Sequence, residues 1–305
     1  MTQIVEQAAP RARGSRNDRF WFSVFVIPNL SLYTLFILVP SALGIYISFC
    51  SWNFFGPIKW VGLHNYQMLL HDPEIPGTLI RTLIFLVLGP IPTILIGFFC
   101  AVLVNWKVKG IGVIRTLFFL PITFSTVMAG IVWSALLQPD SGIINAVLKK
   151  FGINGPGWLN STQWAIPGLT LMVMWLSLPI VIILYLAGLQ RIAPEVIEAA
   201  QIDGAGPWER LKSIIFPAVA TTTQLVAVLE IIAFLGAPLE VAIILTSGGP
   251  INSTTTLAYY SYEQAFINRK VGYSNALVIF QFALFLVVAG VVLGIRKYLR
   301  LRNSK

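Results

Sequence analysis

Two carboxylates stand in a stretch of the sequence that is otherwise almost entirely apolar. Glu230 and Glu240 fall within residues 214–245, whereas the other ten of the 12 acidic residues lie in tails or polar loops. A carboxylate at membrane depth costs several kcal/mol unless it faces water, a partner or a cavity. These two side chains are therefore candidates to accept hydrogen bonds, or to hold a proton or an ion, along a polar path.

The backbone between the two carboxylates carries residues that disturb a helix. Gly236 and Pro238 lie there, and proline removes a hydrogen bond from the helical ladder. Irregular backbone at membrane depth is tolerated where it lines a cavity. The sequence therefore predicts that this segment is interrupted near its middle and faces a polar path.

Residue types that support covalent or metal chemistry are sparse. We find no nucleophile–base pair and no acid–base dyad, and a phosphate-binding G-x-x-x-x-G-K-[ST] loop is absent. Cys50 and Cys100 are the only cysteines, and His64 and His71 are interpreted as loop residues rather than metal ligands. The chain is therefore predicted not to be an enzyme and to hold no metal or cofactor of its own. Any energy source must come from a partner.

Composition places the chain in a membrane. Hydrophobic residues make up 56% of it and charged residues only 11%, whereas about a quarter of a soluble domain is charged. Apolar stretches long enough to cross a bilayer lie at about residues 22–49, 79–104, 112–137, 164–189, 214–245 and 275–296. The prediction is an all-α membrane protein with six transmembrane helices. It comprises an N-terminal tail (1–20), a six-span domain (21–297) and a C-terminal tail (298–305).

The distribution of Lys and Arg predicts the orientation. With the N-terminus inside, the cytoplasmic segments hold most of the 21 basic residues, as the positive-inside rule requires. Arginines before the first span, such as Arg16 and Arg19, suit a retained anchor rather than a cleaved signal peptide. Both termini are thus expected in the cytoplasm. The net charge of +9 then has a topological explanation and does not call for nucleic acid.

The polar loop between the fourth and fifth predicted spans has the residues of a short capped helix. Pro194 suits the first helical position, and Glu195 suits the positive end of the helix dipole. Gly204 can end the helix in a left-handed conformation. The sequence predicts a helix of about nine residues, roughly 13 Å long, on the cytoplasmic side. A short rigid helix held there has a shape suited to docking into another protein.

This loop resembles the E-A-A loop of the integral-membrane subunits of ABC importers. The residues that match the family pattern in identity and spacing are Glu198, Ala199, Ala200, Asp203, Gly204, Ala205, Ile214 and Pro217, while Phe216 replaces a leucine. Blocks at Thr246–Pro250, Ser261–Phe266 and Gly272–Ala276 resemble the sugar-permease branch, of the maltose-transporter first-subunit type. An ordinary capped amphipathic helix is the alternative, but it does not explain these blocks or the six-span frame.

The resemblance implies a function and a set of partners. The chain would be one permease subunit of a bacterial cytoplasmic-membrane importer, forming half of a sugar path by alternating access. The coupling residues would be Glu198, Ala199, Ala200, Asp203, Gly204 and Ala205. The partners would be a second, non-identical permease, two ATPase subunits that bind ATP and Mg, and an extracytoplasmic solute-binding protein.

The family also points to the fifth span as part of the sugar site. This implication covers the neighbourhood of Glu230, Phe234 and Glu240 but not their roles, because the family tends to have Ser and Asn here. Glu230 could instead make a structural hydrogen bond, Phe234 could be core packing, and Glu240 could lie near the outer interface. Glycerol phosphate or another small polar solute is an alternative cargo, although carboxylates repel anions. A secondary transporter using Glu230 or Glu240 is a further alternative, which leaves the E-A-A loop unexplained.

Overall fold

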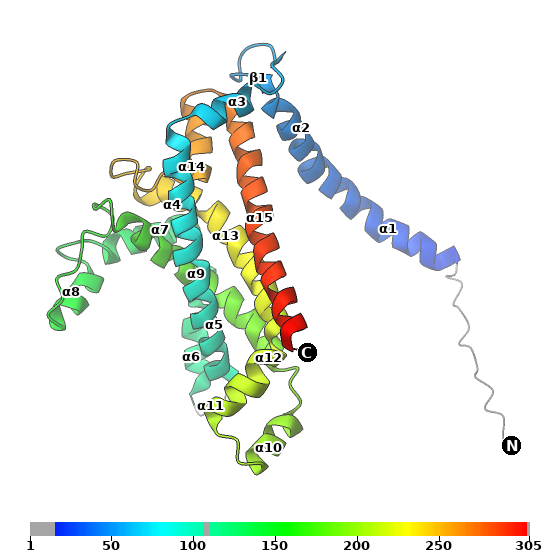
Figure 1. The fold of residues 1–305 in the computed structure, drawn as a ribbon, viewed down its shortest axis with the longest axis vertical. Helices are drawn as coiled ribbons and strands as arrows, with labels where there is room; N and C mark the ends of the chain where they lie inside the picture. Colours follow the sequence, from blue (N-terminus) through cyan, green and yellow to red (C-terminus); the bar gives the residue numbers. More distant parts are fainter. Residues whose placement is uncertain (1–15, 106–109, 304–305) are drawn as a thin grey trace.

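The computed structural model describes residues 16–105 and 110–303, and these are helical almost throughout. The strands among them are a single short antiparallel pair, β1 (Cys50–Ser51) and β2 (Lys59–Trp60). Figure 1 shows an elongated helical bundle with this hairpin at one end. The all-α fold class predicted from the sequence is confirmed.

Among the described residues, five helical segments are long and apolar enough to cross a membrane. The first, Phe20–Ser48, combines α1 (Arg16–Tyr33), the π-helical η1 (Thr34–Leu38) and α2 (Val39–Ser48). The second combines α4 (Glu74–Leu88) and α5 (Pro90–Asn105), and the others are α9 (Ala165–Leu189), α13 (Ala220–Leu245) and α15 (Val271–Asn303). Each corresponds to a predicted span.

The predicted third span, 112–137, is not one continuous helix. It consists of α6 (Ile111–Phe119), the 3-10 turn η2 (Leu120–Thr123) and α7 (Thr126–Leu136), which meet at a bend of 111°. Pro121 cannot donate its backbone nitrogen to the ladder. Ser125 is extended, and its hydroxyl caps the new helix by accepting from the Met128 N–H at 3.2 Å. The third predicted span is therefore a bent pair, because a proline and an N-cap residue end one helix and start another.

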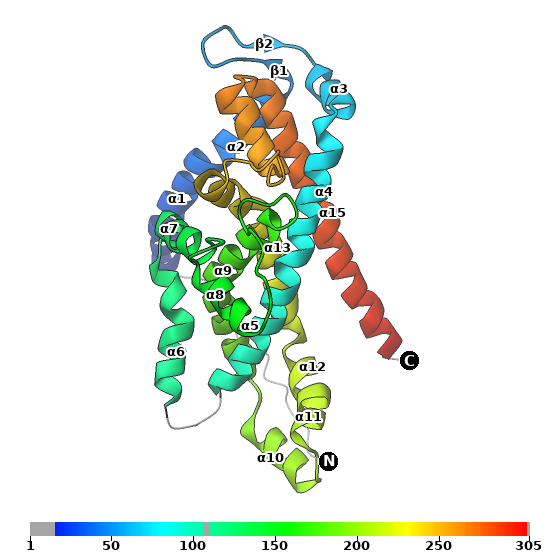
Figure 2. The ribbon, with the colours of Figure 1, turned by 90° about the vertical axis from the view of Figure 1, so that its left-hand side faces the viewer.

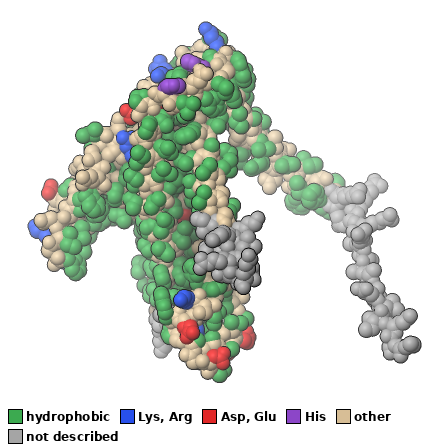
Figure 3. Space-filling view, viewed as in Figure 1, with side chains coloured by type: hydrophobic (Ala, Val, Ile, Leu, Met, Phe, Trp, Pro, Cys, Tyr) green, Lys and Arg blue, Asp and Glu red, His purple; other side chains and the backbone are tan. Residues whose placement is uncertain are grey.

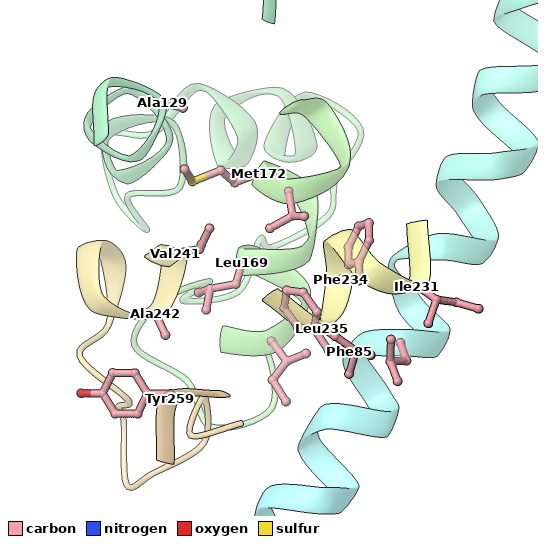
Figure 4. Close-up of a cluster of buried hydrophobic side chains, with 13 residues drawn as sticks. Phe85, Ala129, Leu169, Met172, Ile231, Phe234, Leu235, Val241, Ala242 and Tyr259 are labelled. Atoms are coloured by element: carbon pink, nitrogen blue, oxygen red, sulfur yellow. The ribbon is translucent and has the colours of Figure 1, made fainter. Parts of the chain in front are cut away.

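The core surrounds α9, which packs most extensively against α5 and α13. One buried cluster joins α4, α7, α9 and α13, and Figure 4 shows Phe85, Leu169, Met172 and Phe234 within it. Glycine permits close approach at two of these contacts. A Cβ on Gly89 would overlap the Phe234 ring, and one on Gly97 would overlap Val181.

The first span stands away from the bundle. Figure 1 shows α1 diverging from the other helices, with only the end of α2 near α15. In Figure 2, turned by 90°, this arm lies behind the rest of the molecule. None of its most apolar window is buried inside the chain. Large apolar side chains such as Phe22, Phe25 and Phe36 are exposed along it. Most of the surface of this arm is therefore available to lipid or to another subunit.

The remaining elements gather at the two ends of the bundle. One end carries α10 (Pro194–Ile202), α11 (Pro207–Arg210), the π-helical η3 (Leu211–Ile215) and α12 (Phe216–Ala218). The opposite end carries the hairpin and α3 (His64–His71), with α14 (Leu257–Tyr262) and the π-helical η4 (Glu263–Ile267) near it (Figure 1). A separate lateral helix is α8 (Ile143–Lys150).

Both predicted tails are partly helical. α1 begins at Arg16 and α15 continues to Asn303, so each helix extends past the boundary expected at residue 20 or 298. The rest of these tails, 1–15 and 304–305, lies outside the described residues.

Candidate coupling helix and solute path

The predicted short helix is confirmed as α10, Pro194–Ile202, nine residues long. Pro194 occupies its first position after Ala193, which is extended. At its end Gly204 has a φ of +83°, and its N–H donates to the Gln201 carbonyl at 3.1 Å. The Ala205 N–H donates to the Ala200 carbonyl at 2.9 Å. These two bonds form a Schellman cap, which fixes how the chain leaves the helix.

The helix α10 presents an uncovered surface. Within this chain Glu198, Ala199, Asp203 and Gly204 are exposed, and Ala200 and Ala205 are half-buried. Figure 3 shows acidic side chains at this end of the molecule. On the other side, Ile197 and Gln201 line a hollow of about 740 Å³ shared with α5 and α11. The helix is thus attached along one side and open on the other, which suits a docking element.

Glu230 is buried between two spans. Its side chain is 3% exposed, and its Oε1 accepts a hydrogen bond of 2.5 Å from the Ser177 hydroxyl on α9. Its other oxygen, Oε2, is buried and has no hydrogen-bond partner within the described chain. A buried carboxylate oxygen without a donor is costly. Glu230 therefore uses one oxygen in a contact between helices, and its second oxygen can still accept a hydrogen bond.

Phe234 lies one turn further along α13 and belongs to the core. It is fully buried, and its ring centroid is 5.5 Å from that of Phe85 on α4. In this conformation it exposes no surface to a solute. This is the packing alternative considered above, and a place for Phe234 in the path stays a prediction.

Glu240 is exposed and is not brought together with Glu230. They are ten positions apart in the sequence, which corresponds to about 15 Å along a helix axis. The prediction that the helix is interrupted at Gly236 and Pro238 is wrong, because α13 is continuous from Ala220 to Leu245. The Gln281 amide on α15 donates to the Leu235 carbonyl at 2.9 Å, three residues before the proline, and links α15 to α13 at this point.

A polar cluster that sequence analysis missed lies at the end of the bundle opposite α10. Asp72 Oδ2 accepts from the hydroxyls of Tyr260, at 2.7 Å, and Tyr273, at 2.5 Å. Burial opposes ionisation of Asp72, but the hydrogen bonds from Tyr273 and Tyr260 and from the Glu74 backbone outweigh it, so the pKa of Asp72 lies below its ordinary value. The cluster joins the start of α4 to α14 and α15.

No spacing signal could have revealed this cluster. Asp72 follows a short polar helix and looks like an ordinary loop acid, while its partners lie 188 and 201 residues further along the chain. Only the tertiary fold brings them together. Elsewhere in the described residues, no three His, Cys, Asp or Glu side chains converge as metal ligands would.

These features define a class of protein. Long apolar helices form a bundle, a short capped helix is exposed at one end, and a partly unsatisfied carboxylate lies between two spans. This is the organisation of an integral-membrane transport subunit. The chain belongs to the family described as the binding-protein-dependent transport system inner membrane component, which matches residues 93–303.

Relatives support this assignment. The chain is 32% identical to a probable ABC transporter permease protein of Pyrococcus horikoshii, over 89% of this chain and 94% of the relative. It is 28% identical to the sulfoquinovosyl glycerol transport system permease protein SmoG of Agrobacterium fabrum, over 97% of each chain.

A solved structure shares the fold. It is a bacterial alginate ABC transporter in complex with alginate pentasaccharide-bound periplasmic protein. Its matching chain is 22% identical, with a TM-score of 0.73, and the match covers 90% of this chain and 93% of that one.

Proposed function

We propose that the chain is one permease subunit of an ATP-driven, binding-protein-dependent importer that carries a sugar or sugar-like solute. The observation that carries this proposal is α10, a rigid helix that bears the family's E-A-A residues and ends at the left-handed Gly204. Membership of the transport-system family supports a role for this helix in a transport machine. The chain itself catalyses no covalent step in this proposal.

Coupling would run through the exposed face of α10. Glu198, Ala199, Ala200, Asp203, Gly204 and Ala205 would fit a groove of an ATPase subunit, which binds ATP and Mg. Closure of the ATPase pair would draw the two docked helices of the importer together and open the path outward. Because the Schellman cap fixes the end of α10, the helix would transmit this motion with little bending.

A second, non-identical permease would complete the path. Support comes from the first span, whose apolar surface is largely uncovered by this chain. One α10 per permease would then match two ATPase subunits. The end of the bundle that carries α10 would lie in the cytoplasm. Both chain termini would lie on the same side of the membrane, as the distribution of basic residues predicts.

Glu230 would line the solute path. Its unpartnered Oε2 can accept a hydrogen bond from a hydroxyl group, and sugars offer many hydroxyls. In this structure the Ser177 hydroxyl donates to the other oxygen of Glu230 and orients the carboxylate. The cargo named for SmoG is sulfoquinovosyl glycerol, and that of the solved transporter is alginate, so a sugar-like solute is the class we propose here.

A secondary transporter is the competing function, because a buried, partly unsatisfied carboxylate also suits a proton site. Reconstitution distinguishes the two. We expect the complex of two permeases and two ATPases in vesicles to take up solute only with ATP inside and solute-loaded binding protein outside. A proton ionophore should leave uptake unchanged. Uptake by this chain alone, or uptake abolished by the ionophore, would overturn the proposal.

A further inference from the structure

A polar cavity of about 390 Å³ lies at the end of the molecule opposite α10, between the β1–β2 hairpin, α3 and the start of α15. Lys59, Arg269 and Lys270 line it together with His64, and its lining includes no Asp or Glu. Figure 3 shows basic and histidine side chains at this end. Charge of a single sign in a recess attracts groups of the opposite sign. We call this recess the basic cavity.

Contacts with the backbone of residues 48–50 hold the walls of the basic cavity together. The buried Asn65 amide on α3 donates to the carbonyls of Ser48, at 2.8 Å, and Cys50, at 2.9 Å. A Cβ on Gly272 would overlap the Cys50 carbonyl, so α15 touches the hairpin backbone directly. A preformed recess loses little conformational entropy when a ligand binds.

The lysines of the basic cavity lack an ion-pair partner among the residues that the structure describes. Lys59 and Lys270 form no ion pair with any described residue, and Arg269 lies over the Phe55 ring, 5.5 Å from its centroid. The carboxylate that interacts electrostatically with Lys270 is Asp72, whose Oδ2 already accepts two tyrosine hydroxyls. Positive charge in the cavity is therefore available to a partner.

A second lysine-bearing cavity provides a contrast. Lys149 and Lys150 line a recess beside α8, but Asp140 lines the same recess. Two positive charges there face a carboxylate of this chain. The two sites therefore carry the same number of lysines but differ in whether an acid of the chain accompanies them.

Exposed aromatic residues lie in the segments that contribute lining residues to the basic cavity. Phe55 is 80% exposed, Trp60 62% and Phe266 63%. Aromatic residues and Arg are enriched at protein interfaces, where a few such anchors contribute most of the binding energy. Exposed aromatic residues near a recess with unpaired cations therefore favour a protein partner that supplies carboxylates.

We propose that the basic cavity is a docking site for an acidic surface of the extracytoplasmic solute-binding protein, which inserts a carboxylate between Lys59 and Lys270. This proposal depends on the proposed function, which supplies that partner and places this end of the bundle outside the cell. The carboxylate would bind the two ammonium groups, and Phe55 and Trp60 would pack against the rim of the partner.

The test uses the complete importer in nanodiscs of phosphatidylcholine and measures ATPase stimulation by the solute-loaded binding protein that activates the wild type. We expect Lys59→Glu with Lys270→Glu to raise the concentration needed for half-maximal stimulation at least about tenfold, since charge reversal at an interface produces repulsion. Basal and maximal activity should stay unchanged. The milder pair Lys59→Gln with Lys270→Gln should show a smaller shift in the same direction. Lys149→Glu with Lys150→Glu is the matched control and should show none.

Each other outcome has a defined meaning. An unshifted stimulation curve for both variant pairs, with normal melting temperatures, would overturn the docking site, as would an equal shift in the control. A curve that shifts only after anionic lipid is added would show that a lipid headgroup occupies the cavity. Failure of every solute-loaded binding protein to stimulate the wild-type importer would instead refute the proposed function.

Discussion

The Ser177 hydroxyl and the Glu230 carboxylate join α9 to α13 through one oxygen of Glu230, while the second oxygen is buried without a donor. The pair therefore links two spans but satisfies only one of the two oxygens of Glu230. A purely structural carboxylate would be expected to have donors for both oxygens. The unsatisfied oxygen is the reason to test Glu230 as a residue of the solute path.

The first prediction concerns Glu230 itself. Glu230→Ala removes the acceptor without adding bulk, so we expect normal expression and basal ATPase activity but lower uptake or altered solute selectivity. Glu230→Gln should be milder, since an amide still accepts hydrogen bonds. The measurement is uptake by vesicles at matched protein level over a range of solute concentrations.

Ser177→Ala is the control for this prediction, because it removes only the structural bond. If Glu230 serves helix packing alone, Ser177→Ala and Glu230→Ala should lower the melting temperature similarly and leave selectivity unchanged. Wild-type uptake and selectivity in the alanine variant would remove Glu230 from the path.

Local features of the coupling loop could be predicted in detail from the sequence. Pro194 and Gly204 mark the ends of α10 by backbone restrictions that act whatever the surroundings. The same reasoning failed at Pro238, where a tertiary contact from Gln281 accompanies an unbroken helix. Near Pro121, in contrast, a turn and the Ser125 cap bend the predicted span by 111°. One proline lies where a helix ends and another lies inside a continuous helix, so the presence of a proline does not by itself determine the outcome.

The candidate site shows the same division between local and tertiary information. The burial of Glu230 follows from an apolar segment, but Ser177 is 53 residues away and its contact depends on helix packing. Similarly, neither the Asp72 cluster nor the basic cavity has a sequence pattern, since both combine residues from distant segments.

The second prediction concerns Gly204. Its φ of +83° disfavours any residue with a Cβ, although a Cβ there would touch no other atom within 4 Å. Strain would therefore arise in the backbone and change the direction in which the chain leaves α10. We expect Gly204→Val to assemble and hydrolyse ATP with little stimulation by binding protein and little uptake. The ratio of solute transported to ATP hydrolysed is the quantity to measure.

Gly206 offers a matched control two residues away. It has a φ of −65° and equally open surroundings, so Gly206→Ala should keep the transport ratio close to that of the wild type. Equal ratios for Gly204→Val and the wild type would show that this turn does not transmit the motion.

The third prediction concerns the contact between Gly89 and Phe234. A Cβ on Gly89 would overlap the Phe234 ring, and overpacking a core costs about 1–3 kcal/mol. We expect Gly89→Ala to lower the melting temperature of the purified complex and the yield of folded protein. Adding Phe234→Leu should recover part of the loss, because it provides space. Gly112→Ala, where a Cβ would meet no atom within 4 Å, is the neutral control, and an unchanged melting temperature for Gly89→Ala would refute the packing.

The last prediction concerns Asp72, which accepts hydrogen bonds from Tyr260 and Tyr273. Because its pKa is lowered in the folded state, the ionised form stabilises the fold. That stabilisation is complete above the ordinary pKa of an aspartate and is lost as the pH falls through the lower pKa of the folded state. Asp72→Asn should therefore reduce the melting temperature by a few degrees near pH 7, and the difference from the wild type should shrink as the solution is acidified towards pH 3.

The neighbouring acid provides the comparison. Glu74 is exposed, so Glu74→Gln should change the melting temperature little at any pH. Tyr273→Phe removes one donor, and we expect it to raise the pKa of Asp72 towards its ordinary value, so that the acid-dependent loss of stability becomes smaller and is complete at a higher pH. Melting curves recorded every half unit between pH 3 and pH 7 would measure this. A constant difference between Asp72→Asn and the wild type across that range would show that the ionised carboxylate does not hold α4, α14 and α15 together.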